Sequence, residues 1–191
     1  MRTEQLIEDL EHAIAEQRAR AVEIAAMPAE VVLHRPDDGA WNVLEVFEHL
    51  NLSSGIYVRG LEKVFARSAH RYRANQDFKP GWLGDYFTKG MEPRPDGAIR
   101  WRMRTMRMFD PGRQHGASHA SLDRFVDLCD RFRTLLSTAR ATDLNAMRLA
   151  SSLGPIIRFK AGDALRFPVA HQRRHFLQIE RLLQQASLGR K

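Results

Sequence analysis

The feature that most constrains the fold of this chain is a set of four long segments whose apolar residues repeat at helical spacing. These segments cover about residues 4–27, 41–69, 118–139 and 163–186. Apolar residues at this spacing form one stripe along a helix, and that stripe must be buried against another element. We therefore expect an all-α fold, a four-helix bundle built by a single domain over residues 1–191.

The second segment has the clearest helix start. Asn42 stands before its apolar pattern, and Glu45 follows three residues later. An asparagine side chain accepts a hydrogen bond from the first turn, and a glutamate at this spacing reaches back to the asparagine amide. The fourth segment contains Pro168, which lacks an N–H group and is expected to kink the helix or to mark its true start.

Residues 70–117 are expected to form a long irregular insert between the second and third helices. They contain four prolines and six glycines, which argue against a continuous helix. Within the insert, apolar residues and arginines alternate over residues 98–104, a period typical of extended chain. Residues 142–160 are expected to be a short helix or a loop, broken at Gly154 and Pro155.

The alternating arginines of the insert admit two interpretations. They can face water while Ile99 and Trp101 lie on the bundle, or they can form a basic, aromatic-bearing strip that binds an anionic ligand. In the second case, the candidate ligand-binding residues are Arg100, Arg102 and Arg104.

The net charge of +7 bears on possible partners, because the first 50 residues are acidic and the other 141 are basic. A basic body can bind nucleic acid or an anionic small molecule. Only five of the 30 basic residues are lysine, and arginine-rich usage also arises from genome composition, so nucleic acid is the weaker interpretation. The sequence contains no phosphate-binding loop, dinucleotide-binding motif, nucleophile elbow or H-E-x-x-H motif.

The single cysteine, Cys129, excludes an internal disulfide and a zinc site built from cysteines. Its place in an apolar helical stretch favours a buried structural thiol over a nucleophile. The N-terminus lacks the apolar block of a signal peptide, and no apolar run reaches the length of a transmembrane helix. We therefore expect a cytoplasmic protein that does not enter a membrane.

Two of the eight histidines, His171 and His175, are four residues apart in the fourth segment. Residues at this spacing share a helix face, with Cβ atoms about 5–6 Å apart, so both imidazoles can bind one ion. Gln178 continues this face and could orient a ligand or a metal-bound water. His49 could supply a third nitrogen if the second and fourth helices pack together. Three histidines and an open position are typical of a catalytic metal site.

The same histidines also admit purely structural interpretations. His49 can be a buried, hydrogen-bonded side chain, and His171 and His175 can face the solvent. His115 and His119 share the four-residue spacing, but nearby glycines favour a loop there. Spacing alone therefore leaves the metal site open.

Two segments resemble the DinB/YfiT-like superfamily of proposed metalloenzymes. The sequence HRPDDGAWNVLEVFEHL, residues 34–50, is similar to the start of the second helix in that family, where a tryptophan and a polar cap precede a metal-binding histidine. The sequence VAHQRRHFLQIERLL, residues 169–183, is similar to its C-terminal helix, which carries an H-x-x-x-H pair. The order of the two motifs along the chain also matches.

The resemblance implies a four-helix bundle that binds one divalent ion (zinc, nickel or iron) through His49, His171 and His175, often as a homodimer. Some members activate a low-molecular-weight thiol on the metal. One candidate function is therefore a metal-dependent hydrolase or S-transferase that directs water or such a thiol at a small electrophilic substrate. The alternative is a non-catalytic, dimeric helical bundle for stress response or partner binding, with a structural or vestigial metal site.

Overall fold

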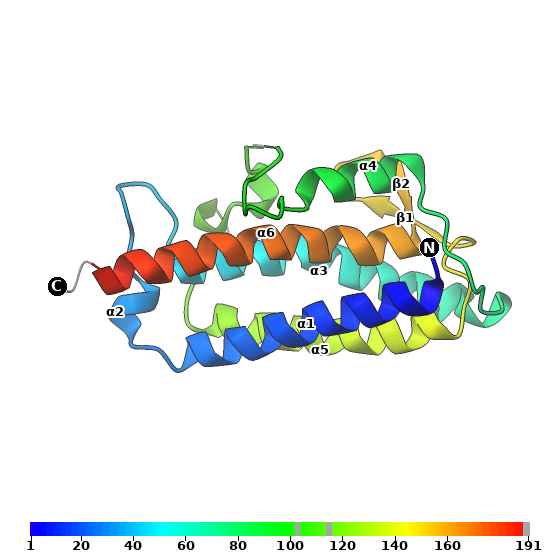
Figure 1. Ribbon diagram of the computed structural model, residues 1–191, viewed down its shortest axis with the longest axis horizontal. Coiled ribbons are helices and arrows are strands. Elements are labelled where there is room, and N and C mark those ends of the chain that lie inside the picture. The colour runs from blue at the N-terminus through cyan, green and yellow to red at the C-terminus, as the bar shows by residue number, and fades with distance from the viewer. Residues whose placement is uncertain (102–103, 114–115, 189–191) are drawn as a thin grey trace.

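The computed structural model describes residues 1–101, 104–113 and 116–188. Helices make up most of this part of the chain, and a two-stranded sheet accompanies them (Figure 1). The α-helices are α1 (Thr3–Ala25), α2 (Ala29–Val32), α3 (Val43–Ser68), α4 (Trp82–Met91), α5 (Ala120–Arg140) and α6 (Ala161–Leu188). The strands are β1 (Arg148–Ser151) and β2 (Gly154–Lys160), and the short 3-10 helices are η1 (Ala69–Arg71), η2 (Arg107–Phe109) and η3 (Pro111–Arg113).

The four long helices α1, α3, α5 and α6 lie side by side (Figure 1). α1 contacts α5 and α6, and α3 contacts the same two helices. Each long helix buries one apolar stripe; fully buried members are Ile7, Ile14, Leu50, Phe132 and Ile179. The helices predicted from the apolar periodicity are therefore present. No helix in the described ranges combines the length and the apolar character needed to cross a bilayer.

α3 and α5 run in the same direction, which explains the length of the chain between them. The side-chain amide of Asn51 donates to the carbonyl of Ser121, and further along both helices Arg131 donates to Glu62 at 2.8 Å. Two parallel neighbouring helices need a connection that returns along their whole length. Residues 69–119 supply this connection.

The connection contains α4, a helix that the sequence analysis did not predict. α4 packs against α6 and β2. Its Gly90 faces Trp101, and a Cβ atom at Gly90 would lie 2.3 Å from that indole ring, so only glycine permits this approach. Trp101 also lies 4.8 Å from the ring of Tyr86. Trp101, one apolar residue of the alternating stretch, thus packs on α4, whose ten residues and two glycines give a weak sequence signal.

Residues 148–160 form an antiparallel hairpin of β1 and β2, so the expectation of a short helix or loop, and with it a strictly all-α fold, is wrong here. Leu149 pairs with Phe159, and both are buried, whereas Arg148 and Arg158 beside them are exposed. This alternation is the pattern of a half-buried strand, but β1 has only four residues, so the alternation is too short to stand out in the sequence. Gly154, with φ of +150°, begins β2 directly after the turn.

The start of α3 agrees with the prediction. The Asn42 side-chain oxygen accepts a hydrogen bond from the backbone N–H of Glu45 at 3.0 Å. In return, the Glu45 carboxylate accepts one from the backbone N–H of Asn42 at 2.9 Å. The predicted capping box is therefore confirmed. α6 begins at Ala161 and continues through Pro168, so the proline does not mark its start. Since proline has no N–H group, the carbonyl of Ala164 lacks its usual helical donor.

Cys129 is buried in α5, and burial raises the pKa of its thiol to about 12. Because the thiolate is the reactive form, the folded protein should not react with Ellman's reagent at mildly alkaline pH. The same protein unfolded in guanidinium should react completely. The absorbance of the released chromophore measures both reactions, and a fast stoichiometric reaction of folded protein would contradict the buried position.

Candidate metal centre

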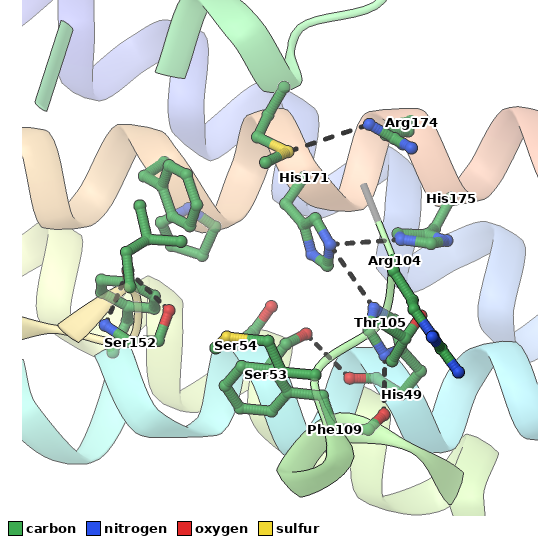
Figure 2. A pocket seen from close by; sticks show the side chains of 16 residues that line it. His49, Ser53, Ser54, Arg104, Thr105, Phe109, Ser152, His171, Arg174 and His175 are labelled. Carbon is green, nitrogen blue, oxygen red and sulfur yellow. Dashed lines mark hydrogen bonds between the residues drawn. The ribbon is translucent and has the colours of Figure 1, made fainter. Parts of the chain in front are cut away.

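Three histidine side chains from two helices point toward one another (Figure 2). His49 comes from α3, and His171 and His175 lie one turn apart on α6. The Nε2 atom of His171 lies 3.4 Å from Nε2 of His49 and 3.2 Å from Nε2 of His175. One potential ligand atom from each residue lies within 4.8 Å of the other two. The structure thus brings together the three histidines that the sequence analysis singled out.

The antiparallel packing of α3 and α6 brings the three histidine rings together. Gln172 donates to Ser54 at 3.1 Å, and the rings of Tyr57 and Phe167 lie 5.3 Å apart, so later residues of α3 face earlier residues of α6. One turn before Ser54, the inward face of α3 presents His49 to the histidine pair. The helical spacing within α6 and the packing of two helices are both needed for the cluster.

Hydrogen bonds at the Nδ1 atoms orient two of the rings. Nδ1 of His49 lies 2.8 Å from the carbonyl oxygen of Phe109, and Nδ1 of His175 lies 2.8 Å from Oε1 of Gln178. A carbonyl oxygen only accepts, so each Nδ1 carries the proton and donates. In a neutral imidazole the lone pair is then on Nε2, the atom that faces the cluster.

The surroundings keep all three imidazoles neutral. Burial is the main cause and lowers the pKa of each ring; the pKa of His175 falls to about 3 and that of His171 well below its ordinary value. The positive charge of Arg174 lowers the pKa of all three further. A neutral imidazole is the form that binds a metal ion, so the cluster needs no deprotonation at neutral pH.

The geometry of the cluster fits a transition-metal ion. Two nitrogens bound to one tetrahedral ion at about 2.0–2.1 Å are about 3.3–3.4 Å apart. The two Nε2 distances at His171, 3.4 and 3.2 Å, match this separation. Three imidazole nitrogens suit zinc, nickel or iron, and they leave one position of a four-coordinate ion open. The three histidines could therefore hold such an ion.

A pocket with roughly 660 Å³ of empty space, its open mouth included, borders the cluster. Its walls are mainly apolar and include Leu153, Phe167 and Pro168. At its end away from the histidines, the Tyr57 hydroxyl bonds with the hydroxyls of Ser151 and Ser152 at 3.0 and 2.9 Å. Burial raises the pKa of Tyr57, so the phenol is protonated at neutral pH. This polar end could not be predicted from the sequence, because the serines reach it through the hairpin, which was not predicted either.

The three arginines of the alternating stretch have different positions. Arg104 is exposed and lines the pocket, whereas Arg100 is exposed and is not among the described residues that line it. Arg102 lies outside the described residues. A further arginine in the pocket wall, Arg174, was not singled out from the sequence. Its only sequence signal is its place directly before His175.

The second histidine pair does not contribute to the cluster in the described part of the chain. His119 is exposed, and its Nε2 lies 2.9 Å from the carbonyl oxygen of Ala25. His115 lies outside the described residues.

The family model of the DinB superfamily matches residues 9–179, which is most of the chain and includes all three clustered histidines. No curated protein and no solved structure matches the chain.

Proposed function

The chain belongs to the DinB superfamily, and from this premise we propose that it is a metal-dependent enzyme. His49, His171 and His175 bind one divalent ion, and the pocket beside them receives a small substrate. One observation carries the proposal: the Nε2 atoms of three neutral histidines converge at metal-binding separations on the wall of a pocket. A site that only stabilised the fold would be closed by a fourth protein ligand, whereas none is present among the described residues.

The bound ion, zinc, nickel or iron, would supply a Lewis acid that lowers the pKa of water or of a low-molecular-weight thiol. The protein's own residues bind and orient. Gln178 holds the ring of His175 through Nδ1, and the Phe109 carbonyl does the same for His49. Arg104 lines the pocket and can interact with an anionic group. The reaction class is attack of water or thiol on a small electrophile, as in a hydrolase or an S-transferase.

Loading with cobalt tests the proposal even while the substrate is unidentified. Untagged, metal-free protein is titrated with Co²⁺, and the visible spectrum reports the coordination number. Addition of cysteine as a small thiol should then produce a near-ultraviolet thiolate-to-cobalt band. Sub-stoichiometric cobalt uptake would contradict the metal site, and stoichiometric uptake with no thiol band would contradict an open position for a thiol.

Replacing Gln178 with alanine is expected to weaken zinc affinity by roughly 10–100-fold, because His175 loses the acceptor that fixes its ring and tautomer. Competition with a chromogenic chelator measures this affinity. The matched control is Gln185→Ala, which removes an amide from α6 but no partner of a clustered histidine. Equal zinc affinity in both variants would contradict the orienting role of Gln178.

A second candidate function is a non-catalytic, dimeric helical bundle for stress response or partner binding, with a structural or vestigial metal site. One observation favours it: no aspartate or glutamate is among the described residues that line the pocket, so no carboxylate is placed there as a general base. Metal analysis distinguishes the two. Protein that purifies without metal and keeps its stability after chelation would support the bundle, and stoichiometric metal that depends on His49 would support the enzyme.

We also propose that α1, α3, α5 and α6 form the four-helix bundle that the family resemblance implies, with residues 69–119 as its insert. A homodimer and a cytoplasmic location belong to the same proposal. Light scattering of the purified protein at several concentrations tests the dimer, which should persist in moderate salt.

A further inference from the structure

Arg174 occupies an unusual position in the wall of the metal pocket. Figure 2 shows it on α6 beside His171 and His175. It lines both this pocket and the neighbouring groove that runs over Trp41 and Gln178. Its guanidinium is partly buried, and Nη1 donates to the carbonyl oxygen of Trp101 at 2.6 Å. The side chain is therefore held in place by a neutral group.

In the part of the chain that the structure describes, Arg174 forms no ion pair, unlike the other partly buried arginines of α6. Arg173 pairs with Glu92 at 2.6 Å, and Arg166 pairs with Asp85 at 3.0 Å. Burial lowers the pKa of the Arg174 guanidinium, but an arginine remains charged at neutral pH. A partly buried cation without a counter-charge is costly, and an anionic partner that binds there would offset this cost.

The charge of the whole site leads to the same conclusion. Arg104 and Arg174 both place a positive charge in the wall of the pocket, beside the three imidazoles. Arg174 lines the same pocket as all three histidines. Because no carboxylate is found among the described lining residues, the protein does not balance these charges inside the pocket. A ligand that carries negative charge would balance them.

We propose that the pocket binds a substrate that carries a carboxylate, and that Arg174 anchors this carboxylate beside the metal-binding histidines. Nε and Nη2 of Arg174 have no hydrogen-bond partner among the described residues, and one edge of a guanidinium matches the two oxygens of a carboxylate. The apolar wall at Leu153 and Phe167 receives the body of the molecule. The inference rests on the proposed function only in naming this molecule as the substrate of the metal centre.

A carboxylate fits this site better than a phosphate. One fixed guanidinium matches a single negative charge and two acceptor oxygens, whereas a phosphate dianion offers three oxygens to be satisfied. No lysine is among the described residues that line the pocket. Arg104, the other lining arginine, is exposed, so its charge is screened by water.

Calorimetric titration with hexanoate tests the anchor, with hexanamide as the neutral analogue and inorganic phosphate as the competing anion. The protein is titrated metal-free and zinc-loaded, as wild type and as Arg174→Gln, Arg174→Lys and Arg173→Gln. Arg173 is the matched control, because it neighbours Arg174 but pairs with Glu92 and does not line the pocket. Circular dichroism establishes that each variant is folded.

Wild-type protein should bind hexanoate more tightly than hexanamide or phosphate, with and without zinc. Arg174→Gln should weaken hexanoate binding by at least about tenfold, Arg174→Lys by less, and Arg173→Gln should leave it unchanged. Undetectable hexanoate binding, equal affinity for hexanamide, tighter phosphate binding, or equal losses in the Arg173 and Arg174 variants would each overturn the carboxylate anchor. Failure to bind zinc would contradict the proposed function instead, and the metal-free titrations would still decide on the anchor.

Discussion

Replacing His171 with alanine is expected to lower zinc affinity by more than ~100-fold, because loss of a ligand exceeds the 10–100-fold cost of losing a group that only orients one. His171 is the central member of the cluster: its Nε2 lies within 3.4 Å of the Nε2 atoms of both His49 and His175. The two remaining histidines could then bind zinc only as a pair. Metal analysis after dialysis against a weak chelator, together with competition titration, measures the loss.

The fold should remain intact in this variant, since His171 is partly exposed and the apolar stripe of α6 is unchanged. Far-ultraviolet circular dichroism is the check. His12→Ala is the matched control, because His12 is an exposed residue of α1 whose only ion-pair partner among the described residues is Glu16. Stoichiometric, tightly bound zinc in His171→Ala, or the same loss in His12→Ala, would remove the basis of the metal site.

The local features of the fold could be predicted from the sequence because they depend on residues close together in the chain. Apolar periodicity determines which face of a helix is buried, and the Asn42 capping box involves residues only three apart. The pair His171 and His175 is local in the same way, because one helical turn places both rings on one face. The role of His49 required the packing of α3 against α6, and the family resemblance supplied that link.

The parts that the sequence did not predict depend on contacts between distant segments. The hairpin of β1 and β2 is too short for its alternation to stand out, and its strands are stabilised by each other. The acceptor at Nδ1 of His49 is the backbone carbonyl of Phe109. Every residue carries such a carbonyl, so no residue type in the sequence marks this position. Arg174 is one of many arginines, and only the folded chain distinguishes it, because it is partly buried in the pocket wall without a carboxylate partner among the described residues.

Replacing Phe47 with alanine should lower the free energy of unfolding by about 3–5 kcal/mol, the usual cost of removing a fully buried aromatic ring. Phe47 has no exposed surface. Its ring lies 5.1 Å from that of Phe125 on α5 and 5.8 Å from that of Phe176 on α6, so it packs α3 against both helices. Chemical denaturation of the metal-free protein measures the loss.

Phe47→Ala should also weaken zinc binding by the protein that remains folded, whereas Phe132→Ala should not. Phe132 is equally buried, but it lies about two helical turns beyond Phe125 on α5 and does not line the pocket. Both variants should lose similar stability, but only Phe47 fixes α3 against α6 next to His49. Metal affinity measured without denaturant separates the two effects. If both variants lose zinc affinity equally, general stability rather than this aromatic contact holds the three histidines in place.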